Sequence, residues 1–418
     1  MRADNLWQQT AQERLETPPL DTDRSCDLVL LGGGFTGCAA ALAVAEAGAS
    51  VLLCEALAPG HGGSGRNVGL VNAGLWLPPE ALARGLGPAR AARLTEMLGQ
   101  GPGLVFDLIA RHGIACEPQR AGTLHCAPDA RGLAELRDRH RQLTAAGAPV
   151  VLLSAADAQA RSGVAGLRGA LHDPRAGTIQ PLAYLRGLAR AAQAAGATLC
   201  GQTPVRSVRR DGADWLLQAG QHQIRARALL VATNAYHIST QGIDIPKIPA
   251  VYYFQAATDP LPDPVLPGHE GCWDTAKIMT SWRRDTEGRL ILGAMGRPED
   301  LLGQRLHLGW ARRKLARLYP HLAGQRFACW WSGRIAMTGD HIPKILQLGP
   351  QGYAITGYSG RGIAPGTVLG QALARVCLGA DPGHLPLPVQ TAHWEPGGAL
   401  REILYETAAR VAHLPGAG

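Results

Sequence analysis

Two short apolar runs stand near the start of the chain, on either side of a segment rich in alanine and leucine. The runs end at Leu31 and Cys54, and their length is typical of parallel strands buried on both faces. The segment between them predicts a helix from about 35 to 47, which Gly48 ends. The pattern therefore predicts one complete strand–helix–strand unit.

Farther along, helical spacing alternates with short strand-like runs. Helices are predicted over 79–113, 181–196, 310–322 and 367–378. Strands are predicted around 116–127, 167–179, 205–208, 215–218, 229–232, 250–295 and 352–356. Together with the first unit, this alternation predicts an α/β fold, and no internal repeat accompanies it.

Composition narrows the class of protein. A length of 418 residues predicts two or three domains, and 46% hydrophobic with 18% charged residues is globular rather than disordered. Nine isolated cysteines without a CxxC pair argue against a disulfide scaffold and a zinc site, so we expect reduced thiols, no metal and a cytoplasmic protein. Eighteen uninterrupted apolar residues occur nowhere, so no membrane span is expected.

The formal net charge is +8, from 41 basic and 33 acidic residues, and only four of the basic residues are lysines. The arginines are scattered and often stand beside acids, as in Arg137–Asp138. A mixed, solvated surface explains this pattern better than a nucleic-acid partner does.

The glycines between the first strand and helix form a G-x-G-x-x-G motif over 32–37. Gly32 permits a tight turn, Gly34 lets the backbone approach a pyrophosphate, and Gly37 lets the helix pack closely on the strand. Glu55 follows the second strand and can accept hydrogen bonds from a ribose diol. The unit predicts a dinucleotide site that favours FAD or NAD over NADP, because the acid would repel a 2′-phosphate.

A glycine-rich loop after the second strand decides between these cofactors. The loop P-G-H-G-G-S-G-R-N over 59–67 resembles that of the D-amino-acid-oxidase-like family of FAD enzymes. Its nearest likeness is to the amine-oxidising branch that includes γ-glutamylputrescine oxidoreductase. Further matching segments follow in the family's order, at 120–124, 179–182, 229–236, 256–261, 331–334 and 357–363.

This resemblance implies an FAD-binding Rossmann-like domain with a central parallel sheet, plus an α+β substrate domain with a large mixed sheet. Carried onto this chain, the first 25 residues are an irregular leader. The FAD-binding domain takes 26–90, 170–235 and 330–418, and the substrate domain takes 91–169 and 236–329.

The resemblance also implies which residues contact FAD. The expected set is Gly32, Gly34, Phe35, Thr36, Gly37, Glu55, Ala56, Ser64, Gly65, Arg66, Asn67, Val68, Gly69, Val205, Thr233, Asn234, Gly333, Arg334, Gly360, Arg361, Gly362 and Ile363. Small residues at 62–69 and 357–363 would let two backbone segments lie against a flat ring.

Three departures from the family's sarcosine-type oxidases matter. Their flavin-linking cysteine is replaced near Ser332, and we expect Cys329 to be a buried thiol and FAD to be non-covalent. Their substrate-binding lysine after the last glycine turn is replaced by Ala364, which disfavours a simple N-methylglycine. Their oxygen-activating lysine is missing from 290–293, although Lys277 stands nearby in the chain.

The expected activity is oxidation of the C–N bond of a primary or secondary amine, or an amino acid derivative, by hydride transfer to flavin N5. The imine hydrolyses to an aldehyde or keto acid plus amine, and oxygen or another acceptor takes the electrons. Candidate catalytic or pocket residues are Tyr358, His61, Arg334, Tyr253 and Trp331, with Tyr252 and Trp273 as further walls. Two alternatives stay open, an NAD-dependent dehydrogenase and a flavin-containing subunit or tRNA-associated module that uses the basic surface.

Overall fold

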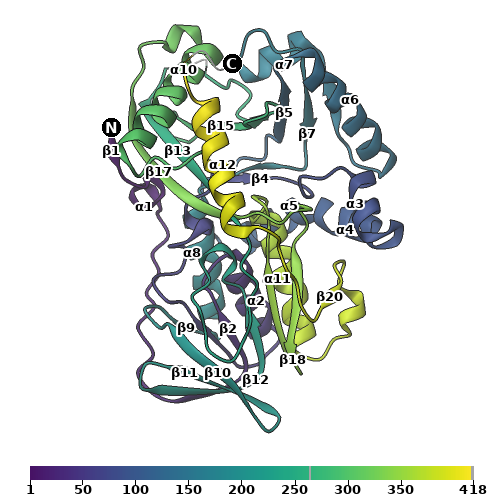
Figure 1. Cartoon of the computed structure of the whole chain (residues 1–418), viewed down its shortest axis with the longest axis vertical. Coiled ribbons are helices and arrows are strands. Elements are labelled where there is room, and N and C mark those ends of the chain that lie inside the picture. Colours follow the sequence, from purple (N-terminus) through teal and green to yellow (C-terminus); the bar gives the residue numbers. More distant parts are fainter. Residues whose placement is uncertain (263–264, 416–418) are drawn as a thin grey trace.

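Two large sheets, each with its own helices, make up the molecule (Figure 1). The computed structural model describes residues 1–262 and 265–415. The expected α/β class, with one mostly parallel and one mixed sheet, is confirmed. No helix of the described chain combines the length and apolar character that crossing a membrane requires.

The lower sheet in Figure 1 holds the predicted strand–helix–strand unit. Its strand order is β20-β18-β19-β12-β2-β3-β9, in which β19, β12, β2, β3 and β9 run parallel. Their bounds are β2 Arg24–Leu31, β3 Val51–Cys54, β9 Thr198–Cys200, β12 His222–Val231, β18 Lys344–Gly349, β19 Gly352–Thr356 and β20 Val389–Gln390. The buried apolar runs of the sequence are these central strands.

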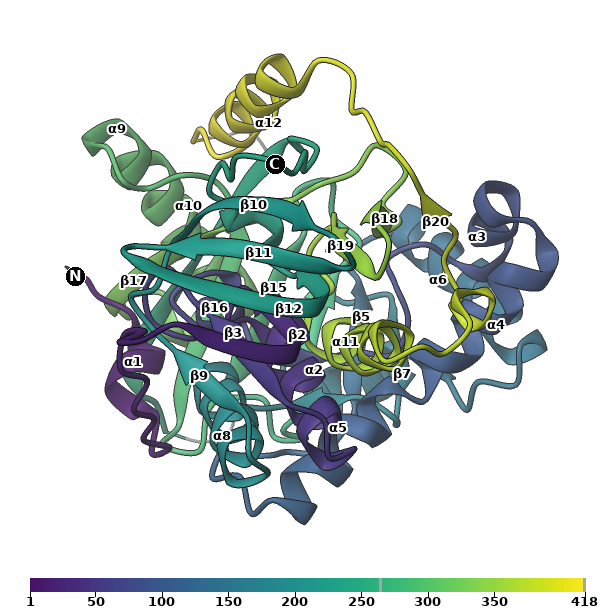
Figure 2. The ribbon, with the colours of Figure 1, turned by 90° about the horizontal axis from the view of Figure 1, so that it is seen from below.

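The two faces of this sheet are covered differently (Figure 2). Helices α2 (Phe35–Glu46), α8 (Pro181–Ala194) and α11 (Ile363–Cys377) pack together on one face. The antiparallel strands β10 (Val205–Asp211) and β11 (Asp214–Ala219) join β12 and cover the other face. Both faces are therefore shielded from water, as parallel strands require.

The upper sheet is mixed and has the order β1-β17-β13-β16-β15-β14-β5-β7-β6. The strands are β1 Arg2–Ala3, β5 Thr123–Ala127, β6 Val151–Leu153, β7 Gly169–Asp173, β13 Ala250–Pro260, β14 Gly271–Asp274, β15 Thr280–Arg284, β16 Arg289–Met295 and β17 Phe327–Ala336. Around it lie the helices α6 (Ala130–Ala145), α7 (Ala155–Ser162), α9 (Leu301–Gly303), α10 (Gly309–Leu318) and α12 (Gly398–Ala412). A two-stranded pair of β4 (Leu70–Val71) and β8 (Gly177–Thr178) completes the strands.

Three sequence expectations change in detail. The helical stretch 79–113 is three helices, α3 (Pro79–Leu86), α4 (Pro88–Gly99) and α5 (Gly101–Arg111), because glycine–proline pairs interrupt it. The last predicted helix, α11, begins at Ile363 rather than at 367. The irregular leader contains β1 and a short helix α1 (Leu6–Thr10), whose Trp7 is completely buried.

Candidate active site

The carboxyl ends of the five parallel strands open onto a cavity of about 580 Å³. The segments that follow β2, β3, β9, β12 and β19 all line it, and the upper sheet closes its other end through β13, β14 and β15. Loops at the carboxyl ends of parallel strands are the usual ligand sites of such sheets. The topology therefore brings together segments that stand more than three hundred residues apart.

The turn between β2 and α2 has the close packing that its glycines predict. A Cβ on Gly37 would collide with the carbonyl oxygen of Gly32, and Gly32 itself has φ +107°, a conformation that favours glycine. Glu55 accepts hydrogen bonds from Gly33 N at 2.7 Å and Leu57 N at 3.0 Å, which hold its carboxylate at the cavity wall.

The loop 60–69 is held in place by its own side chains. Arg66 donates through Nε to the His61 carbonyl at 2.7 Å and through Nη1 to the Ser332 carbonyl at 3.1 Å. Asn67 donates to the Ser64 carbonyl at 2.8 Å, and Ser64 Oγ accepts from Phe35 N at 3.1 Å. The predicted ligands of this loop therefore also fix it against α2 and β17.

One end of the cavity is lined by Val205 and by several residues that the sequence reasoning missed, namely Thr203, Pro204, His237, Ile238 and Thr240. The Thr233 hydroxyl and the His237 ring form a hydrogen bond, with 2.9 Å between Oγ1 and Nδ1. Asn234 Oδ1 accepts from Gly357 N at 2.9 Å and so ties the end of β12 to the second glycine turn. The missed residues follow two strand ends, which is the only signal in the sequence that could have identified them.

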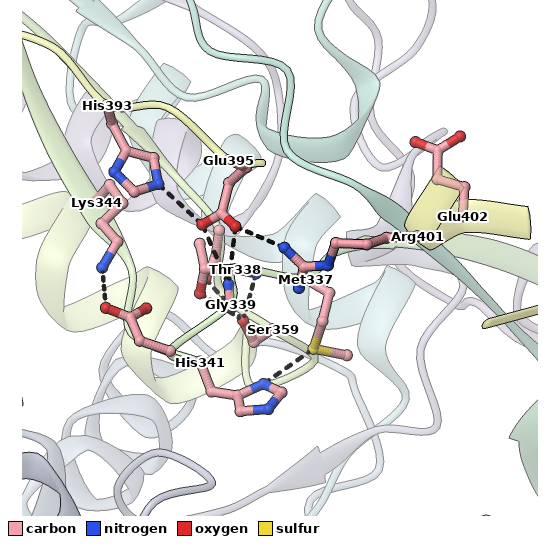
Figure 3. Close-up of polar contacts among 12 residues, drawn as sticks. Met337, Thr338, Gly339, His341, Lys344, Ser359, His393, Glu395, Arg401 and Glu402 are labelled. Carbon is pink, nitrogen blue, oxygen red and sulfur yellow. Dashed lines mark hydrogen bonds and ion pairs between the residues drawn. The ribbon is translucent and has the colours of Figure 1, made fainter. Parts of the chain in front are cut away.

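The second glycine turn, 357–362, is braced from behind (Figure 3). Ser359 Oγ accepts from Thr338 N at 3.3 Å and lies 3.2 Å from Thr338 Oγ1. The next residue, Gly339, donates its N–H to both carboxylate oxygens of Glu395 at 3.1 Å. The chain that leads into α12 is thus connected to the turn through buried polar contacts.

Glu395 is the centre of that connection (Figure 3). It pairs with His393 Nε2 at 2.9 Å and Arg401 Nη1 at 2.7 Å, and its side chain is nearly buried. Burial acts to raise the pKa of this carboxyl, but hydrogen bonds from His393, Gly339 N and Arg401 outweigh it and hold the pKa below its usual value.

Replacing Glu395 with glutamine is expected to lower the free energy of unfolding by about 2 kcal/mol, the scale of hydrogen bonds to buried charged groups. Because the folded pKa is depressed, this contribution is complete above the ordinary value of 4.5 and is lost as the pH falls through the lower folded value. Urea unfolding of the wild type and the variant over a pH series measures it. A difference that stays constant well below pH 4.5 would contradict this assignment.

The other end of the cavity is aromatic. Tyr253, Trp76 and Trp273 line it, with Gln255 and Ser281 between them on β13 and β15. The Tyr253 hydroxyl donates to the Gly293 carbonyl at 3.0 Å and lies 3.0 Å from Ser281 Oγ. Burial raises the pKa of this phenol, so it stays protonated at neutral pH. Of these residues, Trp76, Gln255 and Ser281 were absent from the sequence expectations.

Tyr358 lines the cavity as expected, whereas Trp331 does not. The Tyr358 ring lines the cavity, but its hydroxyl lies 2.8 Å from Thr36 Oγ1, at the start of α2. Trp331 lies outside the cavity lining, because it packs edge-on against Trp7 at 5.5 Å and donates to the Arg66 carbonyl at 2.9 Å. Tyr358 thus supports the turn between β2 and α2, and Trp331 supports the loop 60–69 without lining the cavity.

Most of the remaining predicted residues meet at the cavity. The lining includes Gly32, Gly34, Phe35, Thr36, Glu55, Ala56, His61, Ser64, Arg66, Asn67, Val68, Thr233, Asn234, Gly333, Arg334, Gly360, Arg361, Gly362 and Ile363. Gly37, Gly65 and Gly69 lie just behind it, where their missing side chains allow close backbone contacts. Tyr252 does not line it either.

The charges around the cavity are unequal. Its lining carries Arg66, Arg334 and Arg361, while Glu55 is the one acidic residue among the described residues that line it. No lysine lines it within the same described part, and Lys277 lies exposed in the loop between β14 and β15. Within residues 1–262 and 265–415, no group of three His, Cys, Asp or Glu is arranged to hold a metal ion.

The residues fit FAD as the resident cofactor. The glycines of the β2–α2 turn leave room for a pyrophosphate, Glu55 lines the cavity where it could bind a ribose, and the two glycine-rich segments 60–69 and 357–362 both contribute to the lining. Among the described cysteines, Cys54 alone lines the cavity, at the end of β3, while Cys329 is buried on β17 with a pKa raised by burial to about 11.

Comparisons with known proteins agree with this site. The sequence profile of the family described as FAD dependent oxidoreductase matches residues 27–376. A probable oxidoreductase OrdL of Rhizobium meliloti is 28% identical, with 89% of this chain and 88% of that protein covered. The γ-glutamylputrescine oxidoreductase of Escherichia coli is 27% identical, with 88% and 90% covered. The crystal structure of glycine oxidase from Geobacillus kaustophilus superposes with a TM-score of 0.72 at 22% identity, over 86% of this chain and 96% of that one.

Proposed function

Because this chain belongs to the FAD-dependent oxidoreductase family, we propose that it oxidises the C–N bond of a primary or secondary amine or an amino acid derivative. The product imine would hydrolyse in water to an aldehyde or keto acid and an amine. The names of relatives such as γ-glutamylputrescine oxidoreductase support an amine substrate. The alternative of an NAD-dependent dehydrogenase does not agree with the family, which is described as FAD dependent.

One observation carries the proposal: the aromatic end of the cavity is walled by Tyr253, Trp76 and Trp273, by neutral polar groups and by the Arg361 guanidinium, with no carboxylate or lysine among its described lining residues. Bound FAD supplies the hydride acceptor. An amine gives up a hydride only when its nitrogen is unprotonated, and an apolar aromatic pocket favours that neutral form. Such a reaction needs no protein nucleophile and rests on placement of the substrate.

The protein residues then have positioning roles. Tyr253 stays protonated and forms a wall, while the Tyr358 hydroxyl holds Thr36 at the start of α2. His61 lies exposed at the cavity mouth, where partial burial and the nearby Arg66 lower its pKa, so it is neutral at neutral pH. Arg334 stacks on Tyr236, with 4.5 Å between the guanidinium carbon and the ring centre, and its backbone N–H donates to the Tyr236 hydroxyl at 2.9 Å.

FAD is proposed to be bound without a covalent bond, because Cys329 does not line the cavity and Cys54, the one described cysteine that does, lies at the end of β3 beside Glu55. The absence of a lining lysine within the described residues also favours an electron acceptor other than oxygen, or slow oxidase turnover. A lysine ammonium near the ring would assist the first electron transfer to oxygen, and the cations that line the cavity here are instead the guanidinium groups of Arg66, Arg334 and Arg361.

The test is anaerobic bleaching of the oxidised flavin absorbance by a panel of polyamines, N-methylated amino acids and D-amino acids. We expect bleaching by a primary or secondary amine and only weak bleaching by sarcosine, since Ala364 replaces the family lysine and lines the cavity. Rapid turnover of sarcosine would contradict the argument from Ala364. Bleaching by hydroxy acids but by none of these amines would contradict amine oxidation.

The same preparation tests the remaining alternatives. Admission of oxygen after bleaching, compared with an artificial dye, shows which acceptor reoxidises the flavin. Reduction by a free amine would also argue against a flavin-containing subunit or a tRNA-associated module.

A further inference from the structure

Arg361 is the most unusual charged residue of the cavity. It stands in the second glycine turn, directly before α11, and is only 7% exposed. Its guanidinium carbon lies 4.6 Å from the ring centres of both Trp76 and Trp273. These two indoles meet edge to face at 5.2 Å and 88°, so the cation occupies the corner between them. Stacking against two aromatic faces fixes the orientation of a guanidinium while leaving its N–H groups to other partners.

No acceptor within the described residues pairs with this cation. Its Nε is buried without a hydrogen-bond partner, and no ion pair joins it to a carboxylate in that part of the chain. A smaller cavity adjoins the main one, and the acidic residue that lines it is Asp173. Its carboxylate accepts hydrogen bonds from Nε and Nη2 of Arg175, at 2.9 and 2.7 Å. Burial and the positive charge of Arg139 lower the pKa of Arg361 to about 9, so it is still charged at neutral pH. A buried and unpaired charge is costly unless a ligand completes it.

The indole that stacks on the guanidinium adds a further donor. Trp273 Nε1 is buried without a hydrogen-bond partner, and so is Nδ1 of His125, which donates in the tautomer that carries its proton there. The His125 ring stacks on Trp273 with 3.4 Å between ring centres. Asn72 Oδ1 accepts a hydrogen bond from the Thr123 hydroxyl at 3.0 Å, so the NH₂ group of Asn72 is the part of the amide that could donate to a ligand. An oxyanion is the ligand that satisfies such a set of donors.

The position of Arg361 joins two spaces. Arg361, Asn72 and Trp273 line both the main cavity and a smaller cavity of about 60 Å³ beside it. The small cavity is large enough for a compact polar group but not for the body of a substrate. A substrate whose reacting carbon lies in the main cavity could therefore extend one end to the arginine.

We propose that Arg361, with Asn72 and Trp273, binds a carboxylate at the end of the substrate that is distant from the reacting C–N bond. Ala364, which replaces the family's substrate-binding lysine, carries no charge, so Arg361 would be the residue that recognises the anionic group. That the carboxylate belongs to an amine rests on the proposed function, whereas the anion site itself rests only on these contacts.

The first measurement uses the oxidised holoenzyme and two probes of equal shape, propionate and propionamide. Binding is followed by the change in flavin absorbance and by quenching of indole fluorescence. We expect propionate to bind about tenfold or more tightly than propionamide, since only the carboxylate pairs with the guanidinium. Because this comparison uses the wild-type protein, it does not depend on the folding of any variant. Equal affinities would overturn the proposal.

The second measurement compares Arg361→Met with Arg210→Met, because both arginines stack on an indole ring and Arg210 does not line the cavity. Flavin content and absorbance show that each variant is folded. We expect the dissociation constant for propionate to rise about tenfold in the first variant and less than about twofold in the second. Asn72→Ala is a milder variant that should raise it in the same direction. An unchanged constant in Arg361→Met would show that Arg361 serves the cofactor and would overturn the proposal.

A third comparison separates the two proposals. An alkylamine and the ω-amino acid of the same chain length are tested for anaerobic bleaching. If propionate binds through Arg361 but neither compound bleaches the flavin, the anion site stands and amine oxidation fails. If both bleach equally well in the wild type and in Arg361→Met, amine oxidation stands and the anion site fails.

Discussion

Replacing Gly37 with alanine is expected to abolish stable FAD binding. The added Cβ would collide with the carbonyl oxygen of Gly32 and would push α2 away from β2. That displacement moves the first turn of α2, which the pyrophosphate needs for its hydrogen bonds and helix dipole. We expect the affinity for FAD to fall by about a hundredfold, or roughly 2.8 kcal/mol. Flavin content after gel filtration and a titration of the stripped protein with FAD measure the effect.

Gly103→Ala is the matched control, because Gly103 is also a helical glycine, in α5, and nothing lies within 4 Å of a Cβ added there. This exchange should leave FAD binding unchanged and stabilise the helix by about 0.5–1 kcal/mol. If Gly37→Ala retained FAD as well as Gly103→Ala does, the contact between α2 and β2 would not control the cofactor site.

Replacing Asp274 with asparagine is expected to lower the free energy of unfolding by about 3 kcal/mol, the cost of leaving a buried charge unpaired. Asp274 is 3% exposed at the end of β14 and pairs with Lys314 of α10 at 2.7 Å. Its other oxygen accepts from Thr280 N at 2.9 Å, so it also fixes the loop that joins β14 to β15. Because Met279 in that loop lines the cavity, we also expect weaker binding of ligands at the aromatic end.

Urea unfolding and propionate binding measure both effects, and Asp138→Asn is the control. Asp138 pairs with Arg141 at 2.6 Å, a similar distance, but the two side chains are 56% and 59% exposed. Solvent screens such a pair, so its loss should cost less than about 1 kcal/mol. Equal losses in both variants would mean that burial of the Asp274–Lys314 pair contributes nothing.

Some of the expected site residues could be identified only by family likeness. Ser64, Gly333 and Arg334 carry no local signal of a ligand, yet all three line the cavity with the β2–α2 turn. The family resemblance misplaced residues whose side-chain direction depends on tertiary packing. Trp331 lies in β17, where its ring packs edge-on against Trp7 and does not line the cavity. Lys277 stands near the expected strand in sequence, but the β14–β15 loop places it at the surface.

The sequence by itself determined the strand–helix–strand unit, the glycine turn between β2 and α2, and Glu55 at the end of β3. These features are local, because the length of an apolar run, a glycine's freedom and an acid at a strand end depend on neighbours in the chain. Only the tertiary structure decided that Tyr358 holds Thr36 and that Arg361 stands between Trp76 and Trp273. Each of these contacts joins segments far apart in the sequence, and their geometry follows from how two sheets pack rather than from any local pattern.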